Sequence, residues 1–289
     1  MKSALKNPFA PIDGALAKAL SANIEVALAE DVGSGDVTAQ LLSDEEWAVA
    51  RVIVREDAVL CGAPWFEGVM MRLDWRIRIE WLFAEGDLMP ANSAVCLIEA
   101  PVRSLLTGER AALNFLQLLS AVASQTRQYV QLISGTNAQI YDTRKTLPGL
   151  RLAQKYAVRV GGGQNQRIAL YDAILIKENH IAAAGGVAAA LQAAYALNAK
   201  VPVQIEVESI AQLEEAITAG ATSVLLDNFP LELLRQAVKT TAGRALLEAS
   251  GGIDFTTVRA IAETGVDRIS IGMLTKSVMA TDYSLRIIE

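Results

Sequence analysis

The sequence contains little of the residues on which several common functions depend. It has 2 cysteines, Cys61 and Cys96, and a single histidine, His180, in 289 residues. Two distant cysteines cannot build a disulfide framework or a cysteine-rich zinc site, and one histidine cannot supply a histidine cluster for a metal. The cysteine usage therefore favours a reducing compartment, and we expect a cytoplasmic protein.

Basic residues are also scarce relative to acidic ones, and the formal net charge is −6. This charge argues against a nucleic-acid partner, because binding phosphates requires a basic surface. Long uninterrupted apolar runs are missing as well. The alanine-rich stretch 181–199 is broken by Gly185, Gly186, Gln192 and Asn198, and its spacing is typical of an amphipathic helix. We expect neither a targeting segment nor a membrane span.

What the sequence does contain is a regular alternation of strand-like and helix-like segments in its second half. Short β-branched or leucine-rich runs occur at 138–141, 173–176, 203–207, 223–226, 245–247 and 268–271. Each gap between them is long enough for a helix and two short loops. This alternation predicts an α/β fold with a parallel sheet, and six or more such units indicate a barrel.

Two of the intervening helices carry recognisable end signals. Ser209 and Gln212 form a capping-box pattern, and Gly220 can end that helix. Asp254 is the expected N-cap of a later helix that starts with Phe255.

The first part of the chain has a different pattern. Strand-like runs at 49–54, 77–82 and 94–98 are separated by turn signals, and residues 15–30 are expected to form a helix. These features predict a smaller α+β domain. The leucine spacing over 105–133 predicts a long helix that leads into the second part.

Cationic residues follow the expected strands directly. Arg144 and Lys145 come after one strand, and Lys177 comes after the next. Parallel barrels build their sites at the carboxyl ends of several strands, so these cations are expected to bind an anionic ligand. Arginine can contact both oxygens of a carboxylate, whereas lysine acts as a point charge. Lys155 and Arg159 are expected on a solvated helix face instead.

Two carboxylates lie in the same predicted region. Period-two alternation in 203–208 places Gln204, Glu206 and Glu208 on one face of a strand, which is costly unless that face lines a wet cavity. Glu206 and Asp227 could be acid–base groups, ribose-hydroxyl acceptors or Mg²⁺ ligands. Alternatively, they merely neutralise the nearby cations.

Three glycine-rich segments are candidate phosphate loops, because glycine lets backbone N–H groups approach an anion. They are 161–163, 250–252 and Gly272. The last two follow the final two expected strands, where barrels commonly bind phosphate.

His180, beside Asn179, could be a general base. A lone histidine in such a position is more often a hydrogen-bonded supporting group. We favour that interpretation.

A series of motifs resembles the quinolinate phosphoribosyltransferase family. In the order of the family they are 30–31 with 35–38, 107–110 with Asn114, 142–151, 161–163, Asn165 with Arg167, 175–181, 226–228 and 263–267. Their spread over nearly the whole chain makes the resemblance specific. In one departure, Gln166 stands where the family usually has histidine, which puts one substrate contact in question.

The resemblance implies an activity and an architecture. The activity is the decarboxylating transfer of a phosphoribosyl group from phosphoribosyl pyrophosphate to quinolinate, which gives nicotinate mononucleotide in de novo NAD biosynthesis. The architecture is an open-faced α/β sandwich in 1–115 and an incomplete, seven-stranded TIM-like α/β barrel in 116–276. The tail 277–289 could join the first domain. A homodimer with shared active sites is also implied.

The resemblance further assigns roles to residues. The quinolinate carboxylates would be held by Arg144, Lys145, Gln166, Arg167 and Lys177, and by Arg110 reaching into the site of the other subunit. Ribose hydroxyls and Mg²⁺, the latter largely through substrate and water, would be bound by Glu206 and Asp227. The 5-phosphate would contact Ser250, Gly251, Gly252, Gly272 and Lys276. The catalytic residues would be Lys145, Glu206 and Asp227.

Two alternatives stay open. One is a relative of this family from molybdenum operons, with the same fold and an unknown substrate, which the intact block Lys177 to His180 disfavours. The other is a catalytically silent barrel that acts as a binding protein. Such a protein would be expected to lose some of Arg144, Lys145, Lys177, Glu206 and Asp227, all of which are present.

Overall fold

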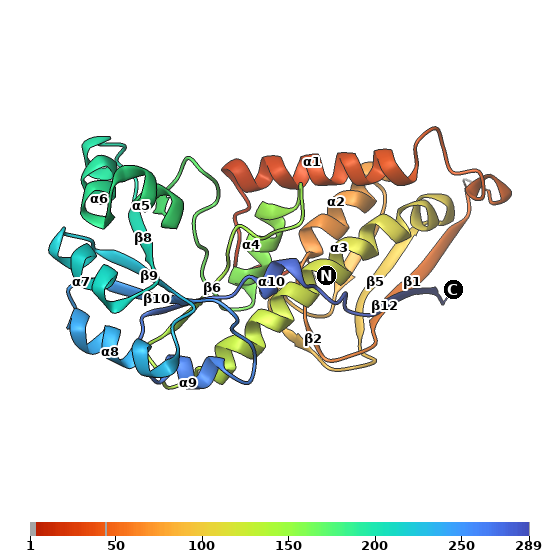
Figure 1. Cartoon of the computed structure of the whole chain (residues 1–289). Helices are drawn as coiled ribbons and strands as arrows, with labels where there is room; N and C mark the ends of the chain where they lie inside the picture. Colours follow the sequence, from red (N-terminus) through yellow and green to blue (C-terminus); the bar gives the residue numbers. More distant parts are fainter. Residues whose placement is uncertain (1–3, 44, 289) are drawn as a thin grey trace. The chain divides into compact units, whose positions relative to one another are not determined.

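The computed structural model describes residues 4–43 and 45–288 (Figure 1). The chain forms two compact units. The first unit consists of the described residues within Met1–Arg127, Thr146–Gly162 and Thr275–Glu289. The second unit consists of Gln128–Lys145 and Gly163–Leu274. The segment 146–162, which the sequence placed with the barrel, therefore groups with the first unit.

The first unit is built on an antiparallel sheet with the strand order β12-β1-β5-β3. Its strands are β1 (Trp47–Val54), β3 (Arg78–Trp81), β5 (Ala94–Pro101) and β12 (Tyr283–Ile287), and β2 (Ala58–Val59) pairs separately with β4 (Leu88–Met89). The three strands that the sequence predicted here are confirmed. The C-terminal strand β12 pairs with β1, while Glu289, the last residue of the tail, lies outside the described residues.

Helices of the first unit supply much of its core. They are α1 (Gly14–Asp31), α2 (Ala63–Leu73), α3 (Val102–Leu132, which continues into the second unit) and α4 (Arg151–Val160), with a 3₁₀ turn at Ala39–Leu41. The predicted long helix is confirmed as α3. Its Leu113, Leu116, Leu119 and Val122 are all buried, as their spacing on one helix face requires.

The expected solvent exposure of Lys155 is wrong. Lys155 is only 2% exposed, whereas Arg159, one turn along the same helix, is exposed. Helix α4 buries seven of its ten residues, so its periodicity does not separate a wet face from a dry one.

The second unit contains a parallel sheet with the strand order β6-β11-β10-β9-β8-β7. Its strands are β6 (Gln139–Tyr141), β7 (Ile174–Ile176), β8 (Val203–Val207), β9 (Ser223–Asp227), β10 (Leu246–Ser250) and β11 (Arg268–Ser270). All six predicted strands are confirmed. The described residues of this unit contain no seventh strand, although Gln164 forms an isolated parallel bridge with Tyr141 at the β6 edge.

Helices connect these strands and lie around the outside of the parallel sheet (Figure 1). They are α5 (Glu178–Ala184), α6 (Val187–Ala196), α7 (Ile210–Thr218), α8 (Leu231–Thr241) and α9 (Val258–Ala262), with α10 (Met273–Lys276) at the border of the units. Among the helices described, none combines the length and apolar character needed to cross a membrane.

The two predicted helix starts have different outcomes. The Ser209 hydroxyl accepts a hydrogen bond from the Gln212 N–H at 3.2 Å and caps α7, as expected. Asp254 does not cap α9, which begins only at Val258. Its carboxylate instead accepts hydrogen bonds from the N–H groups of Thr256 and Thr257 in the preceding turn. A short polar side chain can close such a turn as readily as a helix start.

Candidate active site

The predicted charged residues of the second unit gather at the carboxyl ends of its parallel strands. Lys177 directly follows β7, Glu206 lies in β8, Asp227 ends β9 and Ser250 ends β10. Asp227 is paired in register with Ser250. Parallel pairing therefore brings together residues that are far apart in sequence, at the edge where barrel enzymes place their chemistry.

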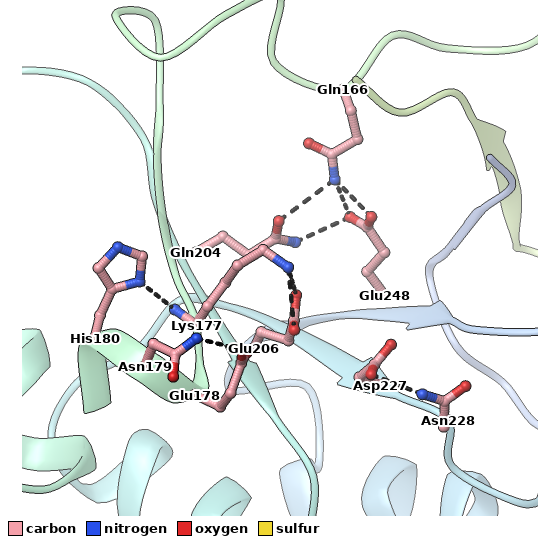
Figure 2. A network of polar contacts seen from close by, with 10 residues as sticks. All are labelled: Gln166, Lys177, Glu178, Asn179, His180, Gln204, Glu206, Asp227, Asn228 and Glu248. Carbon is pink, nitrogen blue, oxygen red and sulfur yellow. Dashed lines mark hydrogen bonds and ion pairs between the residues drawn. The ribbon is translucent and has the colours of Figure 1, made fainter. Parts of the chain in front are cut away.

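Lys177 and Glu206 form an ion pair across neighbouring strands (Figure 2). The Lys177 Nζ lies 2.9 Å from Glu206 Oε2 and 3.3 Å from Oε1. Glu206 is only 9% exposed, so its carboxylate depends on this partner, since a buried charge without one is costly. An incoming anion that contacts Lys177 would compete with Glu206 and free its oxygens for another ligand.

The loops after β9 and β10 are held tightly against each other. The Asn228 amide donates to Asp227 Oδ2 at 2.7 Å, and the Asn228 backbone N–H donates to the Ser250 carbonyl at 2.9 Å. A Cβ atom at Gly251 would press against the Asn228 side chain and lie 3.0 Å from the Asn228 backbone nitrogen, and Gly251 has a φ of +101°. Both the close approach and the left-handed conformation require glycine here.

Gly272, which follows β11, is crossed by the side chain of Lys145. A Cβ atom at Gly272 would lie 3.0 Å from Lys145 Cδ and 3.8 Å from its Nζ. The missing side chain thus lets an ammonium group lie beside the half-buried glycine backbone. This combination suits a phosphate, which needs both N–H donors and positive charge.

Two arginines face the same region of the second unit. Partial burial lowers the pKa of Arg167, and the positive charge of Arg144 lowers it further, while Asp172 acts in the opposite direction. Arg167 Nη1 donates to the Ala173 carbonyl at 3.2 Å. Two guanidinium groups close enough to repel each other favour an anionic ligand between them.

The second unit also contains a buried carboxylate that the sequence did not indicate. Glu248 in β10 is 1% exposed and accepts hydrogen bonds from the side-chain amides of Gln166 and Gln204 (Figure 2). The predicted strand 245–247 stopped one residue short of it. The available signal was a glutamate between Leu247 and Ala249, both buried, because a charge inside an apolar run needs partners.

His180 has the supporting role that we favoured. Its Nδ1 accepts a hydrogen bond from the Lys177 backbone N–H at 3.0 Å at the start of α5. His180 thereby fixes the turn from which the Lys177 side chain extends.

Some expected site residues belong to the first unit. Arg110 in α3 and Lys276 in α10 are both exposed. Gly161, in the first candidate phosphate loop, is buried, and a Cβ atom there would lie 2.5 Å from the Ala123 carbonyl oxygen and 2.6 Å from Thr126 Cβ. Close packing against α3 explains this glycine without a phosphate.

The carboxylates fit Mg²⁺ only in cooperation with a substrate. The described residues contain no group of three or more His, Cys, Asp or Glu side chains that could hold a metal ion. Mg²⁺ is commonly bound by one or two carboxylates together with substrate phosphates and water. Asp227 and Glu206, at the ends of adjacent strands, are the residues available for that arrangement.

A cavity of about 270 Å³ lies at the opposite edge of the parallel sheet. Its charged residues, Arg244 and Asp267, are used by the fold. Arg244 donates to the carbonyls of Thr240 and Thr241, and Asp267 accepts from the Leu247 N–H. This cavity does not share the convergent cations of the carboxyl edge.

Comparisons with known proteins agree with this geometry. Family models described as "Quinolinate phosphoribosyl transferase, N-terminal domain" and "C-terminal domain" match residues 36–120 and 122–286. The chain is 39% identical over 257 residues to a "Probable nicotinate-nucleotide pyrophosphorylase [carboxylating]" from Bacillus subtilis, covering 89% of each chain. A similar protein from Mycobacterium leprae is 39% identical over 272 residues, covering 91% of this chain and 95% of that one.

Solved structures give the same result. The chain superimposes on the nicotinate-nucleotide pyrophosphorylase from Francisella tularensis with a TM-score of 0.92 and 45% identity, covering 96% of this chain and 99% of that one. It superimposes on NadC from Streptococcus pyogenes with a TM-score of 0.91 and 40% identity, covering 96% of this chain and 100% of that one.

Proposed function

The chain belongs to the quinolinate phosphoribosyltransferase family, and we propose that the carboxyl edge of its parallel sheet is where this activity takes place. The enzyme converts quinolinate and phosphoribosyl pyrophosphate to nicotinate mononucleotide, pyrophosphate and CO₂, a reaction of NAD biosynthesis. The observation that carries the placement is the convergence of Lys177, Glu206 and Asp227 on neighbouring strands (Figure 2).

The cations of the site suit the two carboxylates of quinolinate. Arg144 and Arg167 lie close enough to affect each other electrostatically, and a dicarboxylate between them would relieve that repulsion. Lys177 would bind a carboxylate in exchange for Glu206. Gln166 lies beside Arg167, and Lys145 lies where the quinolinate and phosphoribosyl groups would meet.

The phosphoribosyl group suits the other half of the edge. Asp227, and Glu206 once Lys177 is engaged, would accept hydrogen bonds from ribose hydroxyls and hold Mg²⁺ through substrate and water. Ser250, Gly251, Gly252 and Gly272 would surround the 5-phosphate with N–H donors.

The chemistry follows from charge development. The pyridine nitrogen attacks the anomeric carbon while pyrophosphate leaves, so positive charge grows on the ribose ring. The carboxylates of Glu206 and Asp227 stabilise that charge, and Lys145 stabilises the departing anion. Bound Mg²⁺ would neutralise charge on the pyrophosphate. The carboxylate next to the pyridinium nitrogen is then lost as CO₂, and the ring carbon that carried it takes up a proton to give nicotinate mononucleotide.

Strand pairing and cysteine burial support proposals on the fold and the location of the protein. The strand order of the second unit joins its first and last strands, β6 and β11, as a barrel does, and we propose an incomplete TIM-like barrel with the Gln164 segment as a vestigial seventh strand. We also propose a cytoplasmic location, since both cysteines, Cys61 and Cys96, are free and buried.

A homodimer with shared sites is the proposed assembly, in which Arg110 serves the site of the other subunit. Arg110→Ala and Lys145→Ala should each be nearly inactive as homodimers. Mixed subunits would give heterodimers with one doubly damaged site and one intact site. Activity should recover toward about a quarter to a half of wild type, and absence of recovery despite confirmed subunit exchange would refute the shared site.

The activity is tested by incubating the purified chain with quinolinate, phosphoribosyl pyrophosphate and Mg²⁺. Nicotinate mononucleotide, pyrophosphate and CO₂ should form in equal amounts, and chelation of Mg²⁺ should stop the reaction. Absence of nicotinate mononucleotide from this mixture would contradict the proposed placement of the activity and favour a relative with another substrate.

A further inference from the structure

Three polar side chains of the second unit hydrogen-bond to one another at its parallel sheet. They are Gln166, Gln204 in β8 and Glu248 in β10 (Figure 2). Glu248 is 1% exposed, so its carboxylate is enclosed by protein and does not face the substrates. We infer that Glu248 is a positioning residue that holds Arg167 in its substrate-binding place through the Gln166 carboxamide. This inference rests on the proposed role of Arg167.

The direction of the hydrogen bonds fixes how Gln166 is oriented. Its Nε2 donates to both oxygens of Glu248, at 2.6 Å to Oε1 and more closely to Oε2, and to Gln204 Oε1 at 3.4 Å. The reverse orientation would set the amide oxygen against a carboxylate. Because a carboxamide has two N–H hydrogens, the nitrogen of Gln166 is fully used inside the protein. Gln166 therefore orients its neighbour and donates nothing to the substrate in this arrangement.

The opposite side of the same segment is held by a second buried carboxylate. Asp142 is 0% exposed and accepts hydrogen bonds from the Gln166 backbone N–H at 2.8 Å and from the Asn165 amide at 2.6 Å. The Gln166 Oε1 in turn accepts from the Arg167 N–H at 3.3 Å. Gln166, the residue before Arg167, is thus attached at two points. Its main chain is bound to Asp142, which follows β6, and its side chain is bound to Glu248 in β10.

This double attachment acts against the electrostatic repulsion between Arg144 and Arg167. Without a fixed backbone, the two guanidinium groups would move apart while the site is empty. A bidentate arginine–carboxylate contact loses much of its strength when displaced by about 1 Å. The tie to Glu248 keeps Arg167 ready, so less of the binding energy of quinolinate is spent on reorganisation.

The test is Glu248→Gln, which keeps the size of the side chain and replaces one acceptor oxygen by a donor that faces the Gln166 amide. We expect the KM for quinolinate to rise about tenfold, with kcat changed less than about threefold and the KM for phosphoribosyl pyrophosphate nearly unchanged. Ser223→Ala is the matched control, since Ser223 accepts only from the far side of the cluster, from Gln204 at 3.2 Å. It should leave the quinolinate KM unchanged.

A double-mutant cycle separates this role from a general loss of stability. Gln166→Ala breaks the same tie from a less buried position and should raise the quinolinate KM similarly. Adding Glu248→Gln to it should then have little further effect, because both changes remove one interaction. Additive effects, or a quinolinate KM within about twofold of wild type in the folded single variants, would overturn the inference.

Arg167→Ala distinguishes failure of this inference from failure of the proposed function. If Arg167→Ala weakens quinolinate binding and Glu248→Gln does not, the proposed role of Arg167 stands and the positioning role of Glu248 is refuted. If Arg167→Ala leaves quinolinate binding intact, the assignment of Arg167 is itself wrong, and the positioning role falls with it.

Discussion

Glu85 in the first unit and Glu248 in the second are each 1% exposed, yet they are held in different ways. The Glu85 carboxylate accepts hydrogen bonds from the backbone N–H groups of Gly62 and Ala63 at the start of α2, and from the Tyr156 hydroxyl. Glu248 accepts from two side-chain amides. A carboxylate that binds main-chain groups fixes the fold, whereas one that binds side chains can fix the geometry of a site.

Burial of a charged side chain does not by itself indicate a role in function. Burial raises the pKa of Glu85 to about 7, and its hydrogen bonds only partly offset this effect. Burial of the Glu85 carboxylate therefore destabilises the folded state, and this cost cancels part of the stabilisation that its hydrogen bonds provide. We expect changes at Glu85 to alter stability, and changes in the parallel-sheet site to alter activity.

The largest expected effect comes from the site. Lys145 is exposed, so Lys145→Ala should leave the melting temperature nearly unchanged. It should lower kcat/KM by about 100-fold or more, because it removes a cation that stabilises the departing charge. Steady-state kinetics together with thermal unfolding would check this. A variant with a much lower melting temperature and an unchanged turnover would contradict the proposal that the parallel-sheet site determines activity and Glu85 determines stability.

Glu85→Ala should have the opposite profile. It leaves the N–H groups of Gly62 and Ala63 and the Tyr156 hydroxyl buried without their acceptor, which should reduce the free energy of unfolding by about 3–5 kcal/mol. Denaturant titration measures this loss. The activity per folded molecule should stay close to wild type at 25 °C, and a strong loss of kcat in fully folded protein would contradict the comparison.

The pH dependence of stability should also carry the signature of Glu85. The folded state keeps the Glu85 proton up to about pH 7, whereas the unfolded chain releases it above about 4.5, so the free energy of unfolding falls as pH rises through this window. At about 1.4 kcal/mol per pH unit, the window corresponds to on the order of 3 kcal/mol. Glu85→Gln cannot ionise and should lack this fall. If the free energy of unfolding had the same pH dependence in wild type and variant between pH 4.5 and 8, Glu85 would not be the group responsible.

The smallest effect tests a structural feature of the parallel-sheet unit. Ser209→Ala removes the side-chain cap of α7 and should lower the free energy of unfolding by about 1 kcal/mol. Ser209→Asp, which keeps an acceptor at the cap, is the matched control and should be near wild type. Equal destabilisation by both would mean that the cap contributes nothing measurable.

The sequence predicted the strands of the second unit well because each run is short, apolar and bounded by polar turns. Residues 203–207 were placed at the bounds of β8, since Gln204 and Glu206 alternate with apolar neighbours. Glu248 was missed because a charged residue after Leu246 and Leu247 resembles the end of a strand. Only its partners, Gln166 and Gln204, which come from other strands and loops, make its burial possible.

Other errors have a similar origin. Lys155 was expected in solvent because periodicity shows which face of a helix is more apolar, not whether both faces are covered. Asp254 was expected to cap a helix, but the same polar side chain closes a turn before α9. The polar residues at the carboxyl ends of the second unit's strands lie near one another, as the sequence predicted, because neighbouring parallel strands end at the same edge of a sheet. Contacts that depend on tertiary packing have no local signal.

We expect the site to recognise a pyridine that carries two carboxylates. The most direct measurement is the ratio of kcat/KM for quinolinate to that for nicotinate, which lacks the 2-carboxylate, with saturating phosphoribosyl pyrophosphate and Mg²⁺. Arg and Lys partners left without that carboxylate should make nicotinate a poor substrate, by a factor of about 10³ or more. Comparable turnover of the two pyridines would contradict recognition of the 2-carboxylate by this site.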